Sequence, residues 1–182
     1  MKKLLLFTIP LLLSWNITNA QTAVNLSGAT DEVQTTYNFD ITNGFTLEYN
    51  VYMNVMKNYN AGITKGINNI AGPIDMYVHS GGGLQVWLGD GVSTNVGGAP
   101  SGTFIANQWY HIALSVSLDS AYLYVDGVLK SKWSHPVLAN STNPLIIGDR
   151  IDNATNSDAL YDNVRVWSGV RSASEILSYK DS

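Results

Sequence analysis

Carboxylates at alternate positions of one strand could catalyse the hydrolysis of a glycosidic bond, so we looked for this pattern first. Retaining glycosidases need two carboxyl groups about 5 Å apart. A Glu-x-Asp-x-Glu run supplies them, because alternate side chains of a strand share one face. The sequence has no such run, and its three glutamates, Glu32, Glu48 and Glu175, lie far apart. Glu48 stands between Thr46 and Asn50, where we expect a solvated, outward-facing carboxylate.

Motifs for metal-dependent, nucleophilic or phosphate chemistry are also missing from the sequence. It contains no His-Glu-x-x-His, no Gly-x-Ser-x-Gly and no phosphate-binding loop that ends in Gly-Lys. The three histidines, His79, His111 and His135, fall in separate segments. Ser80-Gly-Gly-Gly joins two expected strands and does not open a helix, so we interpret it as a hairpin connection.

Aromatic side chains indicate ligand binding instead. Sugar rings present apolar C–H faces that stack on flat aromatic rings, and Tyr and Trp add a polar tip at little entropic cost. Trp87 and Gln85 share one face of a strand, away from its apolar residues, and Tyr59 lies in a polar stretch, 57–69, that we interpret as a functional loop. We expect these three residues and Trp133 to contact a ligand. The alternative is that they are ordinary core or strand residues.

The elements that must position these residues follow from a period of two. Apolar residues alternate with polar ones over 45–53 and again over 110–118, which predicts strands with one buried face. Asp126-Gly127 predicts a two-residue hairpin turn, across which Tyr122 and Tyr124 share a face with Leu129. Further strands are expected at 74–78, 84–88, 144–148 and 160–167.

One helix is expected, near the C-terminus. Ser172 can cap it, and Glu175 three residues later completes a capping box. Strand after strand with short polar turns is typical of an antiparallel sandwich or jelly roll.

Several segments, taken in order, carry a resemblance to a known family. They are Val24-Asn-Leu-Ser-Gly, Asp31-Glu-Val, Trp109-Tyr-His-Ile-Ala-Leu, Leu123-Tyr-Val-Asp-Gly, Ile147-Gly-Asp, Asp162-Asn-Val-Arg-Val-Trp and Ser172-Ala-Ser-Glu-Ile. In this order and spacing the chain resembles the LamG-like (laminin-G/pentraxin, concanavalin A-like) jelly-roll domains from residue 22 to about residue 180. The resemblance implies an all-β fold, an antiparallel two-sheet jelly-roll sandwich with one short C-terminal helix. Such domains mostly bind glycans or proteins.

The resemblance also implies roles for particular residues. Trp109 and Trp167 sit in packing motifs of the family, so we expect them in the core, and we expect His111 to be structural. Many members hold a calcium ion near the domain edge, and the matching ligands here are Asp31 and Asp162. An oxygen-rich run from Asp149 to Asp158 lacks EF-hand spacing, and we interpret it as a solvated loop.

The first twenty residues have the pattern of an export signal. A basic start at Met1-Lys-Lys precedes an apolar run from Leu4 to Leu13, and Ala20 is a small residue at the expected cleavage point. We therefore expect 1–20 to be a signal peptide of bacterial type and 21–182 to be a single domain. Without Lys2 and Lys3 the formal charge is 8 − 14 = −6. This acidic balance, with no basic stripe, argues against nucleic acid and anionic membranes, and the lack of cysteine excludes disulfides.

Together these observations predict a secreted or cell-surface, non-catalytic module. Its expected ligand is a carbohydrate or glycoconjugate, with calcium assisting as in those family members that hold the ion. A protein–protein adhesion module is the alternative. A glycoside hydrolase with atypical carboxylates is a third, less favoured reading.

Overall fold

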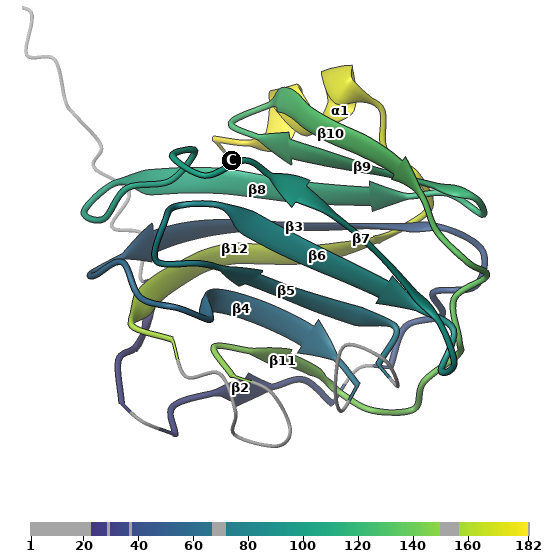
Figure 1. Cartoon of the computed structure of the whole chain (residues 1–182), viewed down its shortest axis with the longest axis horizontal. Coiled ribbons are helices and arrows are strands. Elements are labelled where there is room, and N and C mark those ends of the chain that lie inside the picture. The colour runs from purple at the N-terminus through teal and green to yellow at the C-terminus, as the bar shows by residue number, and fades with distance from the viewer. Residues whose placement is uncertain (1–22, 29, 37, 67–71, 150–156, 182) are drawn as a thin grey trace, which may run out of the picture.

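The computed structural model describes residues 23–28, 30–36, 38–66, 72–149 and 157–181. The expected signal segment, 1–20, lies outside this part of the chain. Two antiparallel six-stranded sheets stack face to face (Figure 1). Sheet A has the order β1-β12-β3-β8-β9-β10, and sheet B has the order β2-β11-β4-β5-β6-β7. The predicted all-β jelly-roll sandwich is thereby confirmed.

Four consecutive strands, β4 to β7, build most of sheet B, and the next three, β8 to β10, belong to sheet A. The bounds of the strands are β1 Val24–Leu26, β2 Val33–Gln34, β3 Phe45–Met53, β4 Asn60–Lys65, β5 Ile74–Val78, β6 Leu84–Gly89, β7 Thr94–Ala99, β8 Trp109–Val116, β9 Ser120–Val125, β10 Val128–Ser134, β11 Leu145–Ile147 and β12 Ala159–Ser168.

Alternation along β3 shows how the sequence builds the core between the sheets. Phe45, Leu47, Tyr49, Val51 and Met53 are all fully buried and belong to one hydrophobic cluster. Because alternate side chains point to opposite faces, the even-numbered residues of β3 stand on the outer face of sheet A. Removal of this apolar surface from water is the main stabilising contribution.

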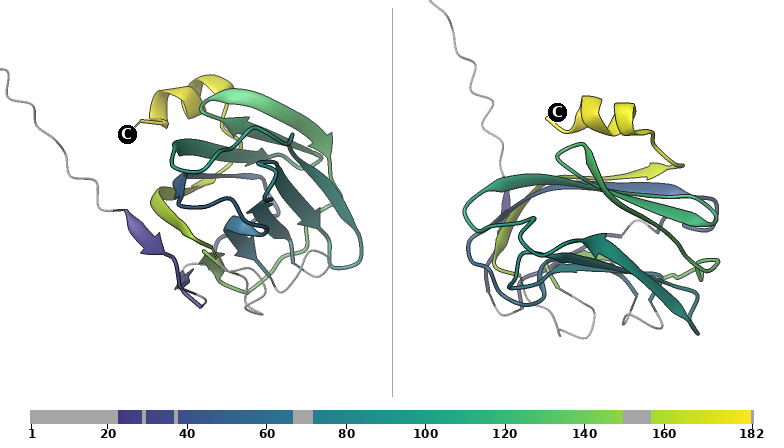
Figure 2. Two further views of the ribbon diagram at one scale, coloured as in Figure 1. Left: turned by 60° about the vertical axis from the view of Figure 1, so that its left-hand side comes forward. Right: turned by 45° about the horizontal axis from the view of Figure 1, so that its top comes forward.

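The predicted hairpin and helix both form. Asp126 and Gly127 adopt φ values of 52° and 76°, as a type I′ turn requires, and join β9 to β10. Helix α1, Ala173–Tyr179, begins at Ser172 with a complete capping box to Glu175. It lies over the outer face of sheet A (Figure 2), where Ile176 packs on Ala113 and Tyr124.

One edge of sheet A is formed by β10 and the other by β1. Lys130 and Lys132 of β10 are exposed. Among the described residues, no helix is long and apolar enough to cross a membrane.

The expectation of a long functional loop over 57–69 was wrong for residues 60–65, and residues 67–69 lie outside the described part of the chain. Residues 60–65 form β4, which pairs with β5 and β11 inside sheet B. Two polar residues in β4 made this strand difficult to recognise from the sequence. Asn60 is fully buried and donates to the Val55 carbonyl at 2.7 Å, and the fully buried Lys65 donates to the Asn143 carbonyl at 2.7 Å. Paired in this way, polar groups are accommodated in a buried strand.

Candidate functional site

Three of the four predicted ligand residues gather on the outer face of sheet B. Trp87 and Gln85 lie on β6, and Tyr77 of β5 lies between them and joins the two. The Trp87 Nε1–H donates to the Tyr77 hydroxyl at 3.0 Å, and that hydroxyl donates to Gln85 Oε1 at 3.2 Å. Cross-strand pairing places Tyr77 opposite Gln85, so neighbouring strands hold the chain of hydrogen bonds rigidly.

Tyr59 extends this group toward the start of β4. Its ring meets Tyr77 edge-to-face at a centroid distance of 5.0 Å, and His79 meets Tyr77 at 5.1 Å. Tyr59 is 44% exposed. We call Tyr59, Tyr77, His79, Gln85 and Trp87 the aromatic row.

The aromatic row offers both stacking surface and hydrogen-bonding groups. Tyr59 and the half-buried Trp87 present partly open rings, and Tyr77 is buried between them. Among the described residues, no partner engages the Gln85 amide nitrogen, and His79 Nε2 is buried without one. Such a surface matches a ligand with apolar C–H faces and peripheral hydroxyl groups.

Trp133, the fourth predicted residue, is separated from the other three. A β-bulge between Leu129 and Ser131 shifts the register, so Trp133 pairs with Ala121, which faces the core. The half-buried indole packs against the core cluster and over Gly97 of β7. Its place between the edges of the two sheets indicates a packing role.

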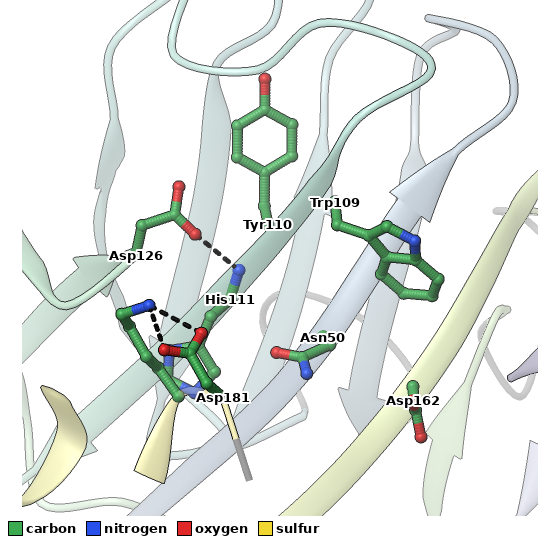
Figure 3. A pocket seen from close by; sticks show the side chains of 8 residues that line it. Asn50, Trp109, Tyr110, His111, Asp126, Asp162 and Asp181 are labelled. Atoms are coloured by element: carbon green, nitrogen blue, oxygen red, sulfur yellow. Dashed lines mark hydrogen bonds and ion pairs between the residues drawn. The ribbon is translucent and has the colours of Figure 1, made fainter. Parts of the chain in front are cut away.

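A pocket of about 290 Å³ lies on the outer face of sheet A (Figure 3). Register alignment across β12, β3 and β8 places Asp162, Asn50 and His111 side by side. Trp109 borders them, Asp126 contributes from the β9–β10 turn, and Lys180 and Asp181 follow α1. The lining residues are Asn50, Trp109, Tyr110, His111, Asp126, Asp162, Lys180 and Asp181.

Trp109 and Trp167 are not in the core, contrary to expectation. Trp109 is 45% exposed, with its ring 5.6 Å from that of Tyr52. Trp167 stands half-buried on β12 beneath the Arg171 guanidinium, which lies 3.9 Å from its ring centre. Both occupy the outer face of sheet A: Tyr110, not Trp109, is the inward residue of β8, and Trp167 pairs with Thr46, an outer-face residue of β3.

Glu48 is not the solvated carboxylate that the sequence suggested. It is fully buried on sheet A, 3.3 Å from His111 Nε2 and 3.4 Å from Arg171 Nε. Arg171, which precedes α1, supplies the guanidinium that balances the Glu48 carboxylate. This pairing could not be seen in the sequence because the two residues are far apart in it. His111, for which we expected a structural role, is 6% exposed and contacts Glu48. Burial of an ionised carboxylate is energetically costly unless such partners lie beside it.

The predicted calcium ligands lie in two different settings. Asp31 is exposed and accepts from the backbone N–H groups of Ser27 and Gly28, at 3.2 and 2.7 Å. Asp162 lines the pocket and accepts from the Asn163 N–H at 2.7 Å. Within the described residues, no three His, Cys, Asp or Glu side chains converge on a metal position.

The oxygen-rich run is only partly described. Residues 150–156 lie outside the described part of the chain. Asp149 is fully buried, which contradicts the expectation of a solvated loop at that position. Asp158 accepts from the Asn54 amide at 2.8 Å.

Solved structures share this architecture at low sequence identity. A heptameric SAP-like pentraxin from Limulus polyphemus superimposes with a TM-score of 0.67 and 15% identity, over 86% of this chain and 80% of that chain. Domain 4 of AbnA, a GH43 extracellular arabinanase from Geobacillus stearothermophilus in complex with arabinotriose, gives 0.66 and 15%, over 87% and 76%. A botulinum neurotoxin type C structure, described as depending on two ganglioside molecules for cell entry, gives 0.64 and 14%, over 86% and 41%.

Sequence comparison assigns the family directly. No curated protein matches the chain in sequence. The Laminin_G_3 family model, described as the concanavalin A-like lectin/glucanases superfamily, matches residues 27–177. The chain therefore belongs to the concanavalin A-like lectin/glucanase superfamily.

Proposed function

We propose that this chain is a non-catalytic carbohydrate-binding module whose binding surface is the aromatic row. The observation that carries the proposal is the hydrogen-bonded series from Trp87 through Tyr77 to Gln85, extended by the Tyr59 ring. A surface whose side chains are already fixed loses little conformational entropy when a ligand arrives.

The shape of the aromatic row favours an extended ligand. Its members come from the approach to β4, from β5 and the turn after it, and from β6, so they span neighbouring strands on one sheet face. Successive sugar units of a polysaccharide would stack on Tyr59 and Trp87, and the Gln85 amide would bond to a hydroxyl. Two structural neighbours support this ligand class: one is described in complex with arabinotriose, and the cell entry of the other is described as dependent upon interaction with two ganglioside molecules.

An export signal at 1–20 would place this module outside the cell, where polysaccharides and glycoconjugates occur. Calcium at Asp31 and Asp162 remains a prediction, and no part of the proposed contact depends on it.

Affinity electrophoresis through gels that contain soluble polysaccharides, arabinan among them, tests the proposal. We expect retardation of the wild type in at least one gel, and loss of that retardation in Trp87→Phe/Tyr59→Ala. Tyr59→Phe keeps the ring and should retain most of the effect. Val137→Ala, at a valine that is 76% exposed, is the matched surface control.

Two outcomes would overturn the proposal. If the folded protein is retarded by no polysaccharide, that result would favour the protein–protein adhesion role. Retardation that is equal in the wild type and the double variant would place the sugar elsewhere. Repeating the gels with a chelator shows whether a divalent cation contributes.

A further inference from the structure

We propose that the pocket on the outer face of sheet A is a second binding site, which takes one small ligand that carries a protonated amine, such as an amino sugar. This site is independent of the aromatic row, because the two lie on the outer faces of different sheets (Figures 1 and 2). Three properties of the pocket carry the inference: most of its open polar atoms accept hydrogen bonds, its side chains are mainly acidic, and it has an exposed indole.

The open polar atoms of the pocket are mostly acceptors. Asp126 accepts from the His111 backbone N–H through one oxygen at 2.9 Å, and Asp162 accepts from Asn163 in the same way. Their second oxygens have no hydrogen-bond partner among the described residues. Asn50, between Asp126 and Asp162 in Figure 3, adds an amide group.

His111 adds a further acceptor from the floor. Its Nε2 lies 3.3 Å from the buried Glu48 carboxylate, which accepts hydrogen bonds only, so the tautomer that fits this contact has its proton on Nε2. Nδ1 is then an acceptor. That atom is buried and has no hydrogen-bond partner in the described part of the chain, on a side chain that is only 6% exposed. A buried acceptor at a pocket indicates a ligand that donates.

The charge of the pocket selects a cation. Lys180 pairs with both oxygens of Asp181, at 2.7 and 2.6 Å, so these two charges cancel. Among the described residues, no cation pairs with Asp126 or Asp162, and the Arg171 guanidinium lies 3.4 Å from Glu48. Within the described residues, no three His, Cys, Asp or Glu side chains converge on one point, so the pocket suits an organic cation better than a bare metal ion.

Trp109 completes the site. Its ring is 45% exposed at the pocket, beside Tyr52. An indole attracts a neighbouring ammonium group and stacks on the C–H face of a sugar. The pocket volume of about 290 Å³ lies at the small end of the range for ligand sites, which suits one sugar ring and not a chain.

Titration of the whole chain with D-glucosamine, D-glucose and N-acetyl-D-glucosamine, followed by NMR at pH 6.5 and low salt, tests this inference. We expect D-glucosamine to bind at least about tenfold more tightly than the two neutral sugars, because charge-assisted hydrogen bonds are the stronger kind. Asp162→Asn and Asp126→Asn keep the shape and the backbone hydrogen bonds, and each should weaken D-glucosamine binding by about tenfold. Asp90→Asn, which alters a remote turn, should leave it unchanged.

Equal binding of the three sugars, or absence of D-glucosamine binding, would overturn the proposal. So would full affinity in Asp162→Asn and Asp126→Asn. Tyr59→Ala leaves this titration unchanged if the two sites are independent, so failure here is distinguishable from failure of the aromatic row. Trp109→Phe should retain binding, and Trp109→Ala should lose it.

Discussion

The indole of Trp133 occupies the space that a side chain on Gly97 would need. Trp133 belongs to β10 of sheet A and Gly97 to β7 of sheet B, so this contact joins the two layers at one edge of the sandwich. A large residue on one strand and the smallest residue on the other let the edges approach closely.

Gly97→Ala should therefore destabilise the fold. The added methyl group meets the indole, and overpacking of this kind typically costs about 1–3 kcal/mol. Chemical denaturation measures the loss. Gly81→Ala is the control, since a Cβ there meets only the Ser101 hydroxyl at 3.7 Å. Combination with Trp133→Leu should recover part of the loss, and strictly additive effects would contradict the contact.

The buried pair of Glu48 and Arg171 predicts a second stability effect. Glu48→Gln leaves the guanidinium without its carboxylate, and removal of one partner of a buried pair costs roughly 3–5 kcal/mol. Urea unfolding should show that Glu48→Gln/Arg171→Met loses less than the sum of the two single variants. Additivity would mean that the two residues contribute separately.

The hydroxyl of Tyr77 should matter more for binding than for folding. Tyr77→Phe removes the group that holds Trp87 and Gln85 in place, so retardation by polysaccharide should weaken severalfold. Tyr110→Phe is the matched control, because its hydroxyl accepts from the Ile105 N–H at 3.0 Å, away from the aromatic row. If both variants reduce retardation equally, the effect is a general loss of stability.

The helix cap predicts a pH dependence. Hydrogen bonds from the Ser172 backbone N–H and hydroxyl lower the pKa of Glu175 below its ordinary value of 4.5. A carboxyl group with a lowered pKa stabilises the fold above its unfolded pKa, and that contribution is lost as the pH falls through the folded pKa. Thermal melts should show wild type above Glu175→Gln at pH 7, with the gap closing below pH 4.5. A gap that is independent of pH would contradict this role, because every other titrating group is common to both proteins.

Ser172→Ala tests the same cap from its other side. It removes the side-chain acceptor for the Glu175 N–H and should cost about 1 kcal/mol at neutral pH. Ser174→Ala, at the adjacent exposed serine, should cost less. If Ser172→Ala and Ser174→Ala lower the stability equally, the capping box is not the cause.

Most of the fold was predictable because its signals are local. The alternation in β3, the Asp126-Gly127 turn and the Ser172–Glu175 capping box each depend on neighbouring residues, and each formed as expected. Trp87 and Gln85 were also placed on one face by strand parity alone.

The errors arose where distant segments or a single inserted residue decide the outcome. Glu48 is balanced by Arg171, which is more than a hundred residues away in the sequence. The bulge after Leu129 turns Trp133 inward, since a shift of one residue exchanges the two faces of a strand. Tyr77, the centre of the aromatic row, was missed, although its alternation with Ile74, Met76 and Val78 assigns it to the outer face of β5.

The β10 edge of sheet A has a consequence for the behaviour of the molecule at high concentration. A second copy that added its own strand beside β10 would bring Lys130 and Lys132 against like charges or out of water. These two ammonium groups oppose growth of the sheet from one molecule to the next. The sandwich thus resists fibre formation at this margin.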